Sequence, residues 1–88
     1  MKTLRDFVDS RESVKGCVFA SSNQYPGYSR GFVYEAQSYD FDFNLGMSVI
    51  RMQVLTTPHR FGEPVGQRYP LAVCLNDVFV GRADNTNL

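Results

Sequence analysis

The chain has 88 residues, of which 43% are hydrophobic and 20% are charged, and nine basic and nine acidic residues give a formal net charge of zero. This length predicts one domain, because second cores appear only in much longer chains. The neutral charge argues against unassisted binding of nucleic acid, which needs a basic field, and against a DNA mimic, which needs an acidic one. Seven Phe and five Tyr residues favour strands and interfaces.

The N-terminal segment predicts a short helix from about residue 4 to residue 12. Thr3 followed by Asp6 is a variant of the capping box in which Asp replaces the usual Glu. Leu4, Phe7 and Val8 then form a narrow apolar stripe at helical spacing. So short a helix is not stable alone, and we expect it to dock on a sheet.

Residues 14–21 and 31–43 are rich in β-branched and aromatic side chains and predict two strands. The alternation of the second strand changes phase partway. Before the change Phe32 and Tyr34 share one face, and after it the other face carries Tyr39, Phe41 and Phe43. Because a period of two cannot slip by one residue in a regular strand, we expect a bulge, bend or break near Ala36–Ser38.

A tight turn at residues 44–46 leads into the longest predicted strand, residues 47–57. Residues 58–70 contain three prolines and no regular spacing of apolar residues, which predicts a loop of about a dozen residues. Loops of this length are often functional.

The C-terminal part predicts a hairpin of two strands, residues 71–75 and 78–82. The two residues between them, Asn76 and Asp77, tolerate the left-handed backbone that a two-residue hairpin demands, and they set Leu75 opposite Val78. The tail, residues 83–88, is polar and is expected to fray.

The predicted fold class is α+β, with a short N-terminal helix packed on a curled, mostly antiparallel sheet of about five strands. Both faces of the predicted C-terminal hairpin are apolar, as in strands covered on both sides. One helix with about three apolar residues cannot cover both faces of such a sheet. Either the sheet curls around its second face, or a second subunit or a partner covers that face, most commonly as a symmetric dimer.

The two cysteines, Cys17 and Cys74, lie far apart within apolar runs and predict reduced, buried thiols of a cytoplasmic protein. A single disulfide that closes a long loop is the alternative. We expect no membrane association, because the first residues lack the apolar run of a signal peptide and no stretch reaches the ~20 apolar residues that span a bilayer.

No catalytic, metal-binding or cofactor-binding motif stands out. His59 is the only histidine, and a catalytic role would need a partner such as Glu63, Glu35 or Cys17 nearby. One His and two distant Cys supply no known metal-ligand spacing, so neither a metal nor a cofactor is predicted. A ribonuclease-like site would need residue types that this chain contains, namely Glu35, Arg51, His59, Arg60 and Arg68. Their arrangement in the sequence shows no pattern that distinguishes such a site.

Two further sets of residues have a structural and a functional interpretation. Tyr25, Tyr28, Arg30 and Phe32 are of the types that stack on single-stranded bases, while the structural interpretation places Phe32 and Tyr34 in the core. Asp40 and Asp42 are of the type that binds divalent cations, and their alternation with aromatic residues predicts an outward, solvated strand face instead.

The sequence therefore favours a non-enzymatic protein-binding module, an accessory or inhibitory protein of the kind that bacteriophages encode. Its partner is predicted to be another protein, or a second copy bound through exposed strand surface. The predicted partner-binding residues, in the aromatic turn and the long loop, are Tyr25, Tyr28, Arg30, His59, Arg60, Phe61 and Arg68. A nucleic-acid-binding or ribonuclease-like domain is the alternative.

Overall fold

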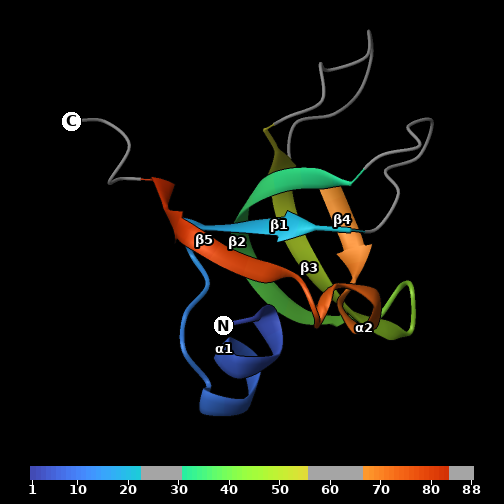
Figure 1. Cartoon of the computed structure of the whole chain (residues 1–88). Helices are drawn as coiled ribbons and strands as arrows, with labels where there is room; N and C mark the ends of the chain where they lie inside the picture. Colours follow the sequence, from blue (N-terminus) through green and yellow to red (C-terminus); the bar gives the residue numbers. More distant parts are fainter. Residues whose placement is uncertain (23–30, 56–66, 84–88) are drawn as a thin grey trace, which may run out of the picture.

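The computed structural model describes residues 1–22, 31–55 and 67–83 (Figure 1). In these ranges two helices and five strands follow one another as α1 Leu4–Ser10, β1 Cys17–Ser21, β2 Phe32–Asp42, β3 Met47–Val54, β4 Gln67–Pro70, α2 Leu71–Cys74 and β5 Val78–Arg82. The strands form one antiparallel sheet in the order β4-β3-β2-β1-β5. The sheet curls without closing into a barrel, and it dominates the fold, which confirms the predicted α+β class.

Helix α1 begins as the capping pattern predicts, since the Asp6 carboxylate accepts the Thr3 N–H at 2.9 Å. It ends at Ser10, two residues before the predicted end, because Arg11 turns into the left-handed region at φ 59°. Its first free N–H groups are satisfied by another part of the chain. Leu4 donates to the carbonyl of Asp77 and Arg5 to that of Leu75, both at 2.9 Å. The helix is therefore held at its N-terminal end by the segment before β5.

The predicted break in the second strand is confirmed. In β2 the register against β3 shifts between Ala36 and Ser38. The shift returns Tyr39 to the side of the sheet that carries Tyr34 and Ala36, and Tyr39 packs against the core. Tyr39 thus serves the same core as Phe32 and Tyr34, rather than the opposite face as the sequence alternation suggested.

The first strand begins at Cys17 rather than at residue 14. Residues 14–16 form a turn, in which the Cys17 N–H donates to the Val14 carbonyl at 2.9 Å and Gly16 adopts φ 78°. Only glycine adopts such a backbone without strain, so the turn falls where the sequence supplies one.

The predicted C-terminal hairpin is wrong. Residues 71–74 form the short helix α2 rather than a strand, and Gln67–Pro70, expected to be loop, form the edge strand β4. β5 has the predicted bounds but pairs with β1, so that Val78 lies opposite Ala20 rather than Leu75. A short apolar run fits a buried helix as well as a strand, and Pro70 is compatible with the start of a helix. Helix α2 carries the chain from one edge of the sheet to the other.

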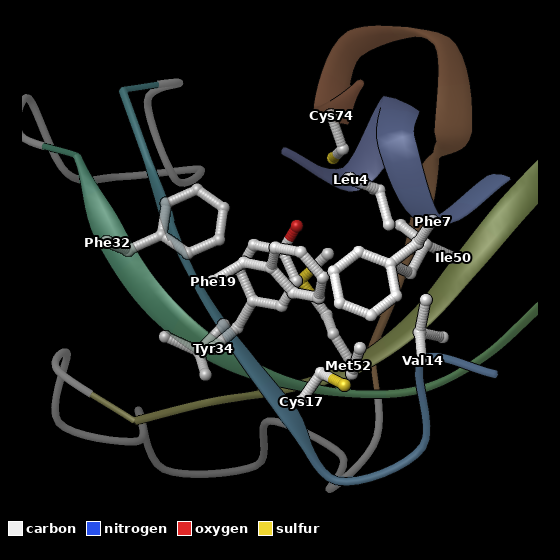
Figure 2. Packing of buried hydrophobic residues seen from close by; sticks show 12 residues of the cluster. Leu4, Phe7, Val14, Cys17, Phe19, Phe32, Tyr34, Ile50, Met52 and Cys74 are labelled. Atoms are coloured by element: carbon white, nitrogen blue, oxygen red, sulfur yellow. The ribbon is translucent and has the colours of Figure 1, made fainter. Parts of the chain in front are cut away.

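The core fills the concave side of the curled sheet (Figure 2). In Figure 2 the rings of Phe7, Phe19 and Tyr34 lie at its centre, with Phe32 at one end and Val14 at the other. Phe7 of α1 packs against Phe19 with ring centroids 5.4 Å apart, and Phe19 stacks on Tyr34 at 5.7 Å. Figure 1 places α1 and α2 at the same end of the sheet, with the β2–β3 turn beside α2.

Candidate functional site

The β2–β3 hairpin carries a group of exposed apolar side chains, which we call the hairpin patch. Its members are Phe41 (50% exposed), Phe43 (89%), Leu45 (50%) and Met47 (41%). The rings of Phe41 and Phe43 meet edge to face, with centroids 5.0 Å apart. Apolar residues exposed singly are normal on protein surfaces, whereas contiguous ones mark interaction sites. Phe41 and Phe43 are in contact, whereas the register pairs Met47 with Asp42 and therefore places Met47 on the other side of the hairpin from Phe41. We take the hairpin patch, centred on this aromatic pair, as the candidate site.

The patch is exposed because the hairpin extends past the part of the sheet that α1 covers. Tyr39 is the last aromatic residue of β2 that packs against the core, and its hydroxyl donates to the Glu12 carbonyl at 3.3 Å, just beyond α1. Phe41 is the next residue on the same side of the strand and is half exposed. Among the described residues, neither Phe41 nor Phe43 packs against the core that α1 helps to form.

Asp42 holds the turn that displays the patch. Its carboxylate accepts the N–H groups of Asn44 at 2.9 Å and Leu45 at 3.1 Å, and its carbonyl accepts the Gly46 N–H at 2.8 Å. Gly46 completes the reversal at φ 69°, a left-handed backbone that suits glycine. The predicted turn at residues 44–46 is thus confirmed, and side-chain bonds fix the shape of the patch.

The prediction that Asp42 points into solvent is wrong. Its side chain is only 5% exposed, and the Arg68 guanidinium donates to it at 2.6 Å. The N–H groups of Leu45 and Asn44 and the Arg68 charge lower the pKa of Asp42, although partial burial opposes them. Asp40 is exposed as predicted, and its carboxylate lies 3.7 Å from the Arg51 guanidinium. Strand alternation places both aspartates on the side away from the phenylalanines, but it does not show which of them Arg68 covers.

Replacing Arg68 with glutamine is expected to raise the pKa of Asp42 while leaving it below its ordinary value. The Leu45 N–H, which contributes most to the lowering, stays in place in this variant. NMR titration of the side-chain carboxyl carbon measures the change. Arg51→Gln, which removes the guanidinium beside Asp40, is the control and should leave the pKa of Asp42 where it is. A return of Asp42 to its ordinary pKa in Arg68→Gln would mean that the turn contributes nothing.

A second cluster of polar groups lies inside the core. The Tyr34 hydroxyl donates to the Asp77 carboxylate at 2.7 Å, and the side chains of Ser21 and Cys74 also bond to that carboxylate. Burial raises the pKa of Asp77, and the three hydrogen bonds offset part of the rise. Burial also raises the pKa of Cys74, to about 12, so this thiol is protonated and unreactive near neutral pH.

This buried cluster has a structural role. Both Tyr34 and Cys74 are fully buried, and Asp77 is nearly so, which leaves no access for a substrate. The Asp77 N–H donates to the Cys74 carbonyl at 2.9 Å, and the Asp77 carbonyl accepts the Leu4 N–H. Asp77 therefore joins α2, the start of α1 and β2 at one point, a connection that the hairpin interpretation of Asn76–Asp77 did not contain.

Most of the predicted partner-binding residues, namely Tyr25, Tyr28, Arg30, His59, Arg60 and Phe61, lie outside the described residues. Arg68 is described, and it is exposed at the edge strand β4 while its guanidinium is paired with Asp42. Phe32 and Tyr34 are buried, which confirms the structural interpretation of that segment. Cys17 and Cys74 are buried thiols that form no disulfide, as predicted. The sequence signal for the hairpin patch, two phenylalanines just before a predicted turn, was present but was assigned to a strand face.

Within residues 1–22, 31–55 and 67–83, no three His, Cys, Asp or Glu side chains come together as metal ligands would. In the same ranges no helix is both long and apolar enough to cross a bilayer. Comparison of the chain with protein-family models, with curated proteins and with solved structures found no match.

Proposed function

We propose that this chain is a non-enzymatic protein-binding module and that the hairpin patch is its contact surface. The observation that supports the proposal is the exposure of Phe41, Phe43, Leu45 and Met47 on one hairpin. Aromatic residues and Met are enriched where proteins meet, because they bury large areas and adapt to the opposite surface. A turn already fixed by Asp42 lowers the entropy that binding costs.

The surroundings of the patch favour a protein over nucleic acid. Arg51 and Arg68, the basic residues nearest the patch on β3 and β4, each face a carboxylate of β2. Phosphate binding requires cations whose charge is not already neutralised by the protein. Phe32 and Tyr34, which stacking on bases would need at the surface, lie in the core.

An accessory or inhibitory role in the cytoplasm, as small bacteriophage proteins have, is the form of this proposal that the sequence favours. The thiols of Cys17 and Cys74, which form no disulfide, are consistent with a reducing compartment.

Site-specific photo-crosslinking tests the proposal. Phe43 is replaced by a photoreactive benzoyl derivative of phenylalanine, and the matched control carries the same group at Leu55, an exposed apolar residue just beyond the other end of β3. Irradiation, first of the purified chain and then with host extract added, is expected to give a protein adduct from position 43 and none from position 55. An excess of unmodified chain should suppress the adduct, and an excess of Phe43→Ser should not. If position 43 gives no adduct under either condition, the proposed function is wrong.

A further inference from the structure

The Asp42 carboxylate divides its two oxygens between the hairpin turn and another strand. Oδ1 accepts the N–H groups of Asn44 at 2.9 Å and Leu45 at 3.1 Å, and Oδ2 accepts a hydrogen bond from the Arg68 guanidinium at 2.6 Å. The torsion that orients an aspartate carboxylate is broad, so it does not by itself direct one oxygen to the turn. A charge-assisted bond to Oδ2 removes that freedom and keeps Oδ1 facing the two N–H groups.

Arg68 reaches this carboxylate from the edge strand β4, across β3, because the strands lie in the order β4-β3-β2. The register pairs Arg68 with Arg51 and Met47 with Asp42, which places these four residues on one side of the sheet. Phe41 lies on the other side. The contact between Arg68 and Asp42 therefore ties the hairpin to β4 from the side opposite to Phe41.

The position of Phe43 depends on this turn. Phe43 follows Asp42 directly and precedes Asn44, so the bond between the Asp42 carboxylate and the Asn44 N–H spans it. Its side chain is 89% exposed, and its ring contact with Phe41, at 5.0 Å between centroids, lies within the same hairpin. Packing therefore does little to hold Phe43, and the bonds of the turn determine how it is presented.

We infer that Arg68 is a positioning residue of the hairpin patch, which holds the Asp42 carboxylate and through it the turn that presents Phe43. The inference rests on the proposed function, because it concerns how the proposed contact surface is kept in shape. It differs from the prediction that Arg68 itself binds the partner. The N–H groups of Leu45 and Asn44, together with Arg68, lower the pKa of Asp42, so the carboxylate is charged near neutral pH and accepts all three bonds.

Hydrogen exchange of the chain alone, measured by NMR, tests whether Arg68 holds the turn. In Arg68→Gln the turn bonds still form, but they open more often, so the amides of Asn44 and Leu45 should exchange about three- to tenfold faster than in the wild type. Arg68→Lys should restore most of the protection, because it returns a cation to Oδ2. Wild-type exchange at Asn44 and Leu45 in Arg68→Gln overturns the inference.

Two controls accompany the exchange measurement. The Leu55 N–H donates to the Val33 carbonyl at 2.7 Å, just beyond the other end of β3, and its exchange should be the same in every variant. Arg51→Gln removes the guanidinium beside Asp40 and should leave the turn amides at wild-type rates. Faster exchange at Leu55 as well as in the turn would mean that Arg68→Gln loosens the whole sheet, and this result also overturns the inference.

Photo-crosslinking at position 43 separates positioning from direct contact. Arg68→Gln should lower the yield of the adduct by about three- to tenfold. Asp42→Asn should lower it too, and Arg68→Gln should cause no further loss in the Asp42→Asn background, because Arg68 acts through that carboxylate. A further loss in the double variant would mean that Arg68 contacts the partner, and the inference is then wrong. If the exchange rates change as expected but the wild type gives no adduct, the proposed function is wrong and the role of Arg68 in the turn stands.

Discussion

Phe7→Ala is expected to lower the free energy of unfolding by about 3–5 kcal/mol, the usual cost of removing a fully buried phenylalanine. Phe7 has no exposed surface, and its ring packs against Phe19 at 5.4 Å and Phe79 at 5.2 Å. Helix α1 is buried mainly through Phe7 and Leu4, and its seven residues cannot stay helical without docking. A chain of this length has a total stability of roughly 4–13 kcal/mol, so the variant is close to unfolding.

Urea denaturation followed by circular dichroism measures the effect of Phe7→Ala. Phe43→Ala is the matched control, because it removes the same atoms from a side chain that is 89% exposed. It should change the stability by less than about 0.5 kcal/mol, as is usual for a surface substitution. Equal losses in the two variants would mean that α1 does not anchor the core through Phe7.

Tyr34→Phe is expected to cost about 1–3 kcal/mol at pH 7, because it removes the hydrogen bond to a buried carboxylate and leaves the ring volume unchanged. The Tyr34 hydroxyl is fully buried, and burial together with the nearby Asp77 charge raises the pKa of this phenol, so that it stays a donor. The loss should be smaller near pH 4, where Asp77 is more fully protonated and the hydrogen bond is not to a charge. Tyr39→Phe, which removes a bond at the edge of the core, is the control and should cost less.

Asp77 also sets a pH dependence of stability whose sign follows from burial. Its folded pKa is raised above the value of the unfolded chain, so the folded state holds the proton more tightly. The stability that Asp77 contributes is therefore present below the unfolded pKa and is lost as the pH rises through the folded pKa. Asp42, whose pKa is lowered, acts in the opposite direction, and its contribution is lost as the pH falls.

The variant Asp77→Asn separates the pH dependence due to Asp77 from that due to Asp42. The amide oxygen still accepts the Tyr34 hydroxyl, but the side chain no longer titrates. Between about pH 4 and pH 7 this variant should lose less unfolding free energy than the wild type. Denaturation series at several pH values measure the difference. If wild type and Asp77→Asn have parallel pH profiles, Asp77 is not the buried titrating group.

The elements that the sequence predicted well are those with local causes. Thr3 and Asp6 start α1 through a bond between residues three apart, and Gly46 ends the β2–β3 turn through its own backbone freedom. The change of phase in β2 is visible in the alternation of its side chains, and it corresponds to the register shift between Ala36 and Ser38. Each of these depends on neighbours in the chain, which is why composition and spacing were enough.

The C-terminal part was decided by tertiary pairing. Residues 71–75 are apolar at every position and fit a strand and a short helix equally well. β5 lies beside β1, more than fifty residues away in sequence, and this leaves Asp77 inside the core against Tyr34 rather than in an exposed hairpin turn. The local signal at Asn76–Asp77 was a turn signal, but it did not specify which strand β5 would pair with.

In the candidate site, too, some features have local causes and others depend on tertiary packing. Alternation determined by itself that Phe41 and Phe43 point to one side of β2 and Asp40 and Asp42 to the other. Whether either side is covered was decided by the tertiary structure, because burial depends on what packs against a strand and not on the strand itself. Helix α1 ends before it reaches Phe41, and Arg68 reaches Asp42 from a strand two positions away in the sheet. Thus the phenylalanines remain at the surface while the aspartate that holds their turn is buried.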